Sequence, residues 1–202
     1  AGGMPEAHHR LLPHRHLTEP HLTVVIPCHN EADNIARYAA ELYPALDALG
    51  VSYEVVIVDD GSSDDTAAAA RALLMTRRDT RIVTLAPNRG MGGAIRAGFD
   101  EARGEWIATL DADLTFPPAS LKEMLAAGIA AKADLVAGSP YLRPGDMAGV
   151  SWVRTMPSLM INALYRGLFG MRLTAYTPVL RLYRSSFVKK LGITSNGFEI
   201  NA

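Results

Sequence analysis

Cysteine and net charge are both scarce in this sequence. Cys28 is the single cysteine among 202 residues, so no internal disulfide can form, and the composition fits a reducing compartment such as the cytoplasm. The 20 lysines and arginines are balanced by 21 acidic residues, for a formal net charge of −1 at pH 7. A protein without a positive field has no general attraction for nucleic acid, so we predict no nucleic-acid partner and expect any basic site to be local.

Long apolar runs are absent as well. A transmembrane helix needs about 20 consecutive apolar residues, and no run in the sequence approaches this length, so we expect no membrane-spanning helix. The N-terminal stretch AGGMPEAHHRLLPHRHL carries charges and prolines where a signal peptide needs an apolar core. Its histidines lack the fixed spacing of a metal site. We therefore predict that residues 1–21 form a disordered or loosely packed tail.

From residue 22 onward, short apolar segments alternate with helical patterns. Amphipathic periodicity predicts helices over residues 31–49, 64–75, 92–103 and 119–131. The segments before, between and after them are LTVVIP, YEVVIVDD, RIVTLA, EWIATLDAD and ADLVAGS, which are apolar nearly throughout. Strands of this kind are typical of a mostly parallel sheet that helices cover on both faces. The sequence therefore predicts an α/β fold.

Polar and glycine-rich clusters follow nearly every predicted strand. In chain order they are PCHNE, DDGSSDD, PNRGMGG, DADLTFPP and GSPYLRPG. Ligands of open α/β sheets bind beyond the carboxyl ends of the strands. We therefore predict that these clusters meet at one edge of the sheet and form the functional site.

The stretch TLDADLTFPP places two carboxylates, those of Asp111 and Asp113, at the end of a predicted strand. Residues two apart in a strand face the same way, and two anions at this spacing repel each other. One interpretation is a solvated turn, because aspartate favours turns. The other is a divalent cation held between the carboxylates, and hard oxygen ligands suit Mg²⁺ or Mn²⁺ bridging to substrate phosphates.

The glycines of NRGMGGAIRAG argue against a nicotinamide enzyme. A dinucleotide-binding fingerprint follows the first strand of its fold, whereas Gly90, Gly92 and Gly93 follow the third predicted strand. No Walker G-K-[ST] motif is present either. The helix start behind these glycines either meets a phosphate or packs closely on the sheet. Similarly, Asp60 in VIVDDGSSDDT either accepts a hydrogen bond from a base or ribose or forms a turn with Gly61.

The pattern changes after residue 145. In SWVRTMPSLMINALYRGLFGM the polar residues recur every four positions and form one stripe on a helix; they are Arg154, Ser158, Asn162 and Arg166. This segment is either an amphipathic helix with a solvated basic edge or an anion site bordered by a lipid-facing surface. The last 27 residues predict a strand or loop followed by a short helix, and the fold is expected to continue beyond residue 202.

The ordered set VVIPCHNEADNI, VVIVDDGSSDDT, NRGMGGAIRAG, DADLTFPP and GSPYLRPG resembles the family 2 glycosyltransferases with a GT-A fold. Within them it resembles the dolichol- or polyprenyl-phosphate mannose synthase branch. The resemblance spans residues 22–202. It implies a Rossmann-like sheet in which residues 22–140 bind a nucleotide sugar and residues 141–202 bind the acceptor.

The resemblance also implies roles for individual residues. The nucleotide would be bound by Pro27, His29, Asn30, Glu31, Asp59, Asp60, Gly61, Gly92, Asp111 and Ala112. Asp111 and Asp113 would hold Mg²⁺ or Mn²⁺. The acceptor phosphate would be bound by Arg143, Arg154, Ser158 and Arg181. Asp111, Asp113 and Arg154 would be the catalytic residues.

The sequence departs from the family pattern before Arg181, where AYTPVLR lacks the usual aspartate and Gly-Phe, and at two further positions. Thr115 stands where a glutamine that also reaches the cation is usual, and Pro140 stands where an arginine is usual. Arg143 is the expected substitute for that arginine.

The expected reaction is an inverting, metal-dependent transfer of a hexose, mannose from GDP-mannose in the first instance, to a polyprenyl or dolichyl monophosphate. A phosphate monoester has a second pKa of about 6 and is largely a dianion at neutral pH, so the enzyme must position and neutralise it rather than deprotonate it. The expected location is the cytoplasmic face of a membrane, with peripheral contact through residues 156–171. The alternatives are a UDP-sugar transferase acting on polyprenyl phosphate or a polysaccharide, and a noncatalytic nucleotide-sugar-binding module.

Overall fold

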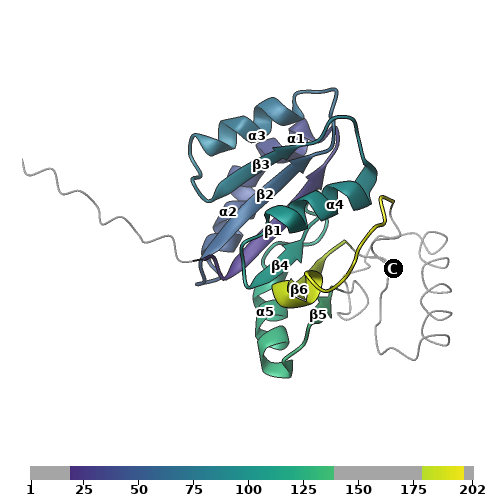
Figure 1. Ribbon diagram of the computed structural model, residues 1–202. Coiled ribbons are helices and arrows are strands. Elements are labelled where there is room, and N and C mark those ends of the chain that lie inside the picture. Colours follow the sequence, from purple (N-terminus) through teal and green to yellow (C-terminus); the bar gives the residue numbers. More distant parts are fainter. Residues whose placement is uncertain (1–18, 139–178, 198–202) are drawn as a thin grey trace, which may run out of the picture.

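The structure of the protein, a computed structural model, describes residues 19–138 and 179–197. These residues form one six-stranded sheet with the strand order β3-β2-β1-β4-β6-β5 (Figure 1). The strands are β1 (Leu22–Cys28), β2 (Tyr53–Asp59), β3 (Thr80–Thr84), β4 (Trp106–Thr109), β5 (Leu135–Ala137) and β6 (Arg181–Arg184). Strand β6 runs antiparallel to both β4 and β5, and the pairs among β1 to β4 are parallel. The predicted α/β fold with a mostly parallel sheet is confirmed.

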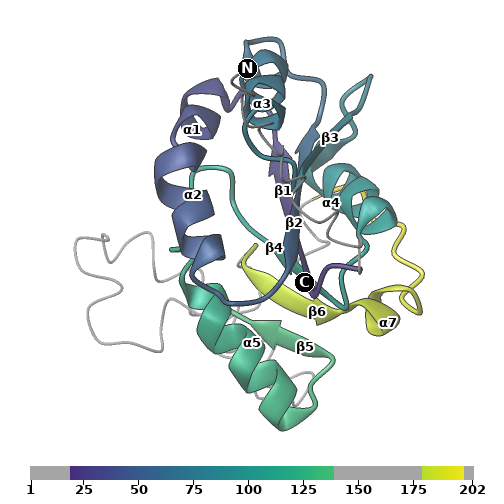
Figure 2. The same cartoon turned by 90° about the vertical axis from the view of Figure 1, so that its left-hand side faces the viewer.

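Helices cover both faces of the sheet, which Figure 2 shows nearly edge-on. They are α1 (Ala32–Ala36), α2 (Tyr38–Asp47), α3 (Thr66–Leu74), α4 (Gly90–Glu101), α5 (Ser120–Ala131) and α7 (Ser185–Val188). One core cluster joins the strands to α1, α2, α3 and α5, and the other joins them to α4 and α7. Because successive strand side chains point to opposite faces, Val24 belongs to the first cluster and Val25 to the second.

Strand β1 lies at the centre of the fold because it is apolar on both faces. All seven of its residues are buried, and it pairs with β2 on one side and β4 on the other. Its register with β2 runs from Leu22 opposite Tyr53 to Cys28 opposite Asp59. The two strands therefore end together at the carboxyl edge of the sheet.

One predicted helix was wrong in its extent. The predicted helix 31–49 is divided into α1 and α2 at Arg37, whose amide donates to the Asn34 carbonyl three residues back. At the end of the predicted tail, the His21 amide donates to the Ser52 carbonyl and the Trp106 amide donates to the His21 carbonyl. Residues 1–18 lie outside the described residues. In the described ranges, no helix has the length and apolar character needed to span a bilayer.

Gly98, on the buried side of α4, provides a test of how tightly this helix packs on β1. A Cβ atom at Gly98 would lie 2.2 Å from Cγ1 of Val25. Alanine is the better helix former by about 1 kcal/mol, but overpacking a buried contact costs about 1–3 kcal/mol. We therefore expect Gly98→Ala to lower the unfolding midpoint in urea, measured by circular dichroism. Gly192→Ala is the control, because no atom lies within 4 Å of a Cβ there; an unchanged midpoint for Gly98→Ala would show that α4 packs less closely.

Candidate nucleotide-sugar site

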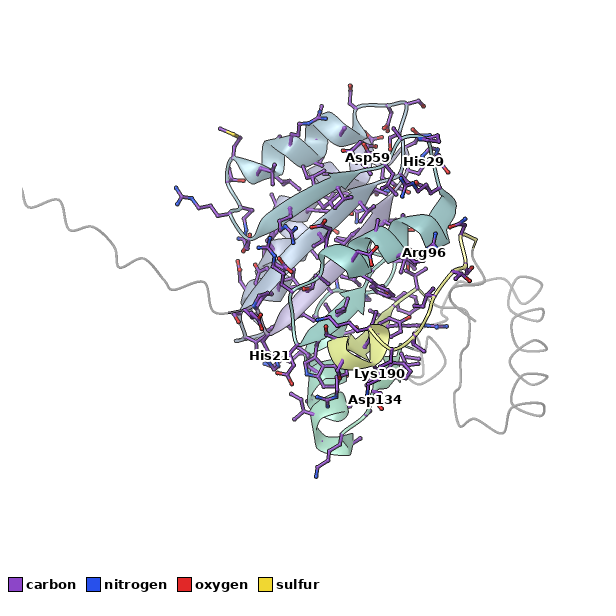
Figure 3. All side chains as sticks on the ribbon, viewed as in Figure 1. His21, His29, Asp59, Arg96, Asp134 and Lys190 are labelled. Atoms are coloured by element: carbon purple, nitrogen blue, oxygen red, sulfur yellow. The ribbon has the colours of Figure 1, made fainter. Side chains whose placement is uncertain are left out.

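Four of the five polar clusters predicted from the sequence follow strands at the carboxyl edge of the sheet, whereas GSPYLRPG lies outside the described residues from residue 139 onward. His29–Glu31 follow β1, Asp60 and Gly61 follow β2, and Leu110–Asp113 follow β4. Because these three strands are parallel neighbours, their ends lie side by side. Figure 3 shows His29 and Asp59 next to each other at this edge.

Asp60 is the most firmly held of the predicted nucleotide ligands. Its side chain is buried, and Oδ1 accepts a hydrogen bond from the Arg89 amide at 2.7 Å. Its own amide donates to the Cys28 carbonyl at 2.8 Å, and its carbonyl accepts from Asn88 Nδ2 at 2.9 Å. The ends of β1, β2 and β3 are therefore joined through one aspartate.

Asp59 and Gly61 shape the turn after β2. Asp59 is buried, and its Oδ1 accepts from the Ser62 amide at 3.0 Å. Gly61 has φ +67°, a backbone conformation that residues with a Cβ rarely adopt. A Cβ there would also lie 3.0 Å from the Asn88 backbone nitrogen, so both the backbone angle and the lack of space disfavour a larger residue. Asp59 and Gly61 therefore stabilise the turn after β2, and their predicted contact with a nucleotide stays a prediction.

Hydrogen-bonding groups lie against both nitrogens of the His29 ring. Nδ1 lies 2.9 Å from the Asp60 carbonyl oxygen and 3.1 Å from Asn88 Nδ2. Nε2 lies 3.3 Å from Asn30 Nδ2, and Asn30 is oriented by the Ser63 amide, which donates to its Oδ1 at 2.9 Å. The exposed ring is thereby fixed at the mouth of the site.

Two further predicted nucleotide ligands are Pro27, which lies in β1, and Glu31, which directly precedes α1. Pro27 is buried in β1 opposite Val58. The Glu31 amide donates to Thr66 Oγ1 at 2.7 Å, and its Oε2 accepts from Asn34 Nδ2 at 2.6 Å. The Glu31 carboxylate is thus oriented within the turn that begins α1.

The expectation that Asp111 and Asp113 sit in a strand was wrong. Strand β4 ends at Thr109, where its pairing with β6 begins opposite Arg181 and its pairing with β1 ends opposite Val25. Beyond that point a turn forms, closed by the Leu114 amide bonding to the Asp111 carbonyl at 3.1 Å. The two carboxylates therefore lie in a turn, and strand alternation does not set their directions.

The two carboxylates differ in environment. Burial raises the pKa of Asp111 to about 6, and the charges of Asp113 and Glu31 add to this shift. Asp113 is exposed, and Thr115 donates to it twice, from its amide at 2.9 Å and from its hydroxyl at 2.7 Å. Between them, the buried Ala112 carbonyl accepts from the Tyr38 hydroxyl at 3.0 Å. Thr115, which departs from the family pattern, therefore orients Asp113.

This arrangement fits a hard divalent cation that is shared with a ligand. Asp111 is half-buried among carboxylates, and a cation would relieve the repulsion that raises its pKa. In the described part of the chain no cluster of three or more acidic, histidine or cysteine side chains could hold a metal alone. Asp111 and Asp113 would supply two oxygen ligands, and Mg²⁺ or Mn²⁺ commonly completes its coordination with substrate phosphates and water.

Of the remaining predicted ligands, the structure describes two and leaves three outside the described residues. Arg181 is buried at the start of β6, opposite Thr109 and close to the turn that carries Asp111. Gly92 is buried in the first turn of α4, and its amide donates to the Asn196 carbonyl at 2.9 Å. Arg143, Arg154 and Ser158 lie outside the described residues, as does the whole predicted stripe.

Sequence reasoning missed three residues that shape this site. Asn88 and Arg89 bind Asp60, and Asn196 binds the start of α4. Asn88 and Arg89 stand in the cluster PNRGMGG, directly before the glycines that begin α4. Asn196 has no local signal, because its contacts lie about 100 residues away in the sequence.

Comparison with known proteins identifies the family. Residues 23–192 match the family model described as Glycosyl transferase family 2. The chain belongs to this family. The resemblance drawn from the ordered motifs is therefore confirmed at the level of the family.

Two curated members of the family share more than a third of their aligned residues with this chain. An undecaprenyl-phosphate 4-deoxy-4-formamido-L-arabinose transferase from Edwardsiella ictaluri is 37% identical over 172 residues, which are 84% of this chain and 51% of the relative. A protein of the same name from Shewanella sediminis is 34% identical and is covered to 50%. The chain thus spans about half the length of the curated relatives it matches.

Solved structures with a similar fold are more distant in sequence. The Mycobacterium tuberculosis glucosyl-3-phosphoglycerate synthase aligns with a TM-score of 0.65 at 19% identity, over 90% of this chain and 63% of that one. The mannosyltransferase PcManGT from Pyrobaculum calidifontis, solved with GDP-Man and Mn²⁺, aligns with a TM-score of 0.61 at 21% identity, over 89% of this chain and 49% of that one. These matches establish a GT-A-like fold.

The raised pKa of Asp111 predicts a pH dependence of stability. The folded protein keeps this proton to about pH 6, whereas the ordinary value is 3.8, so the contribution of Asp111 to stability falls as the pH rises from about 4 through 6. We expect Asp111→Asn to raise the free energy of unfolding by about 1–3 kcal/mol above pH 7 and by little below pH 4. Urea denaturation in EDTA at both pH values measures the difference. Asp100→Asn, on the exposed side of α4, is the control; equal effects of Asp111→Asn at both pH values would contradict the assignment.

Proposed function

We propose that this chain transfers a sugar from a nucleoside diphosphate donor to a polyprenyl monophosphate. One observation carries the proposal: Asp111 and Asp113 lie at the same carboxyl edge as His29 and Asp60. Two relatives that are 37% and 34% identical over most of the chain are named as transferases to undecaprenyl phosphate, which supports the acceptor class.

The donor nucleotide is placed over the ends of β1 and β2. His29 offers an exposed ring, and Asp60 offers a carboxylate whose Oδ1 is already held by the Arg89 amide, so Oδ2 retains capacity to accept from a base or ribose. The diphosphate then extends toward β4, where Asp111 and Asp113 would hold Mg²⁺ or Mn²⁺. When bound, this ion would neutralise the charge that develops on the leaving diphosphate.

The acceptor phosphate is the nucleophile in this proposal. As a dianion near neutral pH, it attacks the anomeric carbon in line with the departing diphosphate, so the configuration inverts and no general base is needed. Arg181 lies near the required position, at the start of β6, and Arg143, Arg154 and Ser158 are proposed to complete the phosphate site. Guanidinium groups suit this task because they bind phosphate oxygens bidentately.

The transferred sugar is proposed to be a 4-amino-4-deoxy-arabinose derivative rather than mannose. Both curated relatives carry 4-deoxy-4-formamido-L-arabinose in their names, whereas the GDP-mannose-bound neighbour shares 21% identity and supports the fold. The mannose prediction from the sequence stays a prediction. The place of action is proposed to be the cytoplasmic membrane face, with peripheral contact through residues 156–171.

A donor and acceptor screen tests this function. Thermal-shift measurements with UDP, GDP and their sugars, with and without Mn²⁺, identify the nucleotide, because a ligand of the native state raises apparent stability. Transfer from the stabilising donor to a short polyprenyl phosphate is then followed by mass spectrometry. We expect a glycosyl-phosphate lipid and no product with free sugar as acceptor. A donor that binds with Mn²⁺ but is never consumed would instead identify a noncatalytic nucleotide-sugar-binding module.

The metal role of Asp113 gives a separate prediction. We expect Asp113→Ala to remove the extra thermal stabilisation that Mn²⁺ adds to nucleotide binding and to lower transfer by about 100-fold or more. The fold should persist, because Asp113 is exposed and its partner Thr115 lies in the same turn. Asp100→Ala serves as the control. If Asp113→Ala keeps the full Mn²⁺-dependent shift, the proposed metal ligand is wrong.

A further inference from the structure

The glycine-rich start of α4 binds a segment from the far end of the described chain. The amides of Gly92 and Gly93 donate to the Asn196 carbonyl, at 2.9 and 3.3 Å. Arg96 Nη1 donates to the Thr194 carbonyl at 3.0 Å, and Arg96 Nη2 donates to Asn196 Oδ1. Figure 1 shows the segment after α7 running back to this end of α4, and Figure 3 labels Arg96 there. Helix α4 thus binds both the main chain and the side chain of Asn196.

The absence of side chains at the helix start is what permits this contact. A Cβ at Gly92 would lie 2.6 Å from the Asn196 carbonyl carbon and 2.7 Å from the Gly197 oxygen. A Cβ at Gly90 would lie 2.7 Å from the Asn196 oxygen. These distances are too short for any real Cβ contact, so the glycines fit residues 194–197 closely.

The same contact occupies the groups that would bind a phosphate at the helix start. The first amides of a helix point outward without partners and carry its partial positive charge. Here two of them meet the Asn196 carbonyl, whose oxygen carries partial negative charge. The role predicted for Gly92 is thereby reinterpreted: its amide holds residues 194–197.

The turn before α4 connects this contact to Asp60. The Gly90 amide donates to Asn88 Oδ1 at 2.9 Å, and Asn88 Nδ2 donates to the Asp60 carbonyl at 2.9 Å. The neighbouring Arg89 amide binds Asp60 Oδ1 at 2.7 Å. Residues 88–90 are therefore held by Asp60 on one side and continue directly into the glycines that Asn196 binds on the other.

We propose that Asn196 is a positioning residue for the donor site. By holding the start of α4 it holds residues 88–90, and these orient the Asp60 carboxylate. The part of this inference that concerns the donor rests on the proposed function. The part that concerns the contact does not, and the two are measured separately.

Amide hydrogen exchange in the free full-length chain tests the contact. We expect Asn196→Ala to speed exchange at Arg89, Gly92 and Gly93 by about tenfold, because a charge-assisted hydrogen bond is lost and local opening becomes easier. Gly92→Ala should have a larger effect, and Asn196→Asp, which keeps the acceptor for Arg96, should restore slow exchange. Gly192→Ala is the matched control in the same segment. Unchanged exchange in both Asn196→Ala and Gly92→Ala would overturn the inference.

Donor affinity tests the connection to the site. With the nucleoside diphosphate that stabilises the unmodified protein, calorimetry should give a Kd about three- to tenfold higher for Asn196→Ala and an unchanged Kd for Asn196→Asp and Gly192→Ala. In transfer assays the donor KM should rise while kcat at saturating donor stays the same. Faster exchange with an unchanged Kd would overturn the positioning role and leave the proposed function standing. If the unmodified protein binds no nucleotide, the proposed function and the donor role both fail, and the exchange data still decide the contact.

Discussion

The register of β1 with its two neighbours is the constraint on which the rest of the structure depends. Cys28 ends β1 directly opposite Asp59, so the Asp60 amide reaches the Cys28 carbonyl and the His29 ring reaches the Asp60 carbonyl. On the other side, pairing with β4 stops at Val25. Strand β1 therefore extends three residues beyond β4, and the turn that carries Asp111 and Asp113 forms in the remaining space. A shift of one residue in β1 would move each of its side chains to the opposite face of the sheet, so that Val24 and Val25 would exchange core clusters.

The acidic residues at this edge divide into two groups according to their partners. Asp59 and Asp60 are buried, but each accepts a hydrogen bond from a backbone amide, which compensates for the loss of water. Asp111 is shifted toward its protonated form by burial and by neighbouring charges. Carboxylates whose pKa is raised by burial and by neighbouring charges are common at functional sites, because folding them into such a place costs free energy that ligand binding can recover. Asp111 is therefore a candidate functional residue. Asp59 and Asp60 are thus held by hydrogen bonds within the fold, whereas a bound cation would relieve the repulsion at Asp111.

The donor side and the far end of the described chain are physically connected. Strand β6 inserts between β4 and β5 in the sheet and brings Arg181 beside the end of β4. After α7, residues 194–197 return to α4. Two segments from the predicted acceptor-binding part, residues 141–202, thus contact the elements that carry the candidate donor residues. Side chains on both parts can therefore converge on one reaction centre.

Much of the fold and the place of the site follow from local patterns in the sequence. Continuous apolar segments such as LTVVIP must be buried on both faces, and helices between them make the sheet parallel, so the carboxyl edge and the clusters at it were predictable. The ends of elements were less so: the strand pattern EWIATLDAD continues to Asp113, yet β4 stops at Thr109, because its pairing with Arg181 and Val25 ends there. The partners of individual groups could not be read from the sequence at all. Asn196 meets Gly92, and Arg89 meets Asp60, through the path of the chain in space. Hydrophobic periodicity involves residues that are close in the sequence, so it can be read without the structure. The hydrogen-bond partners of these groups are far away in the sequence, so they are set by distances that exist only after the chain has folded.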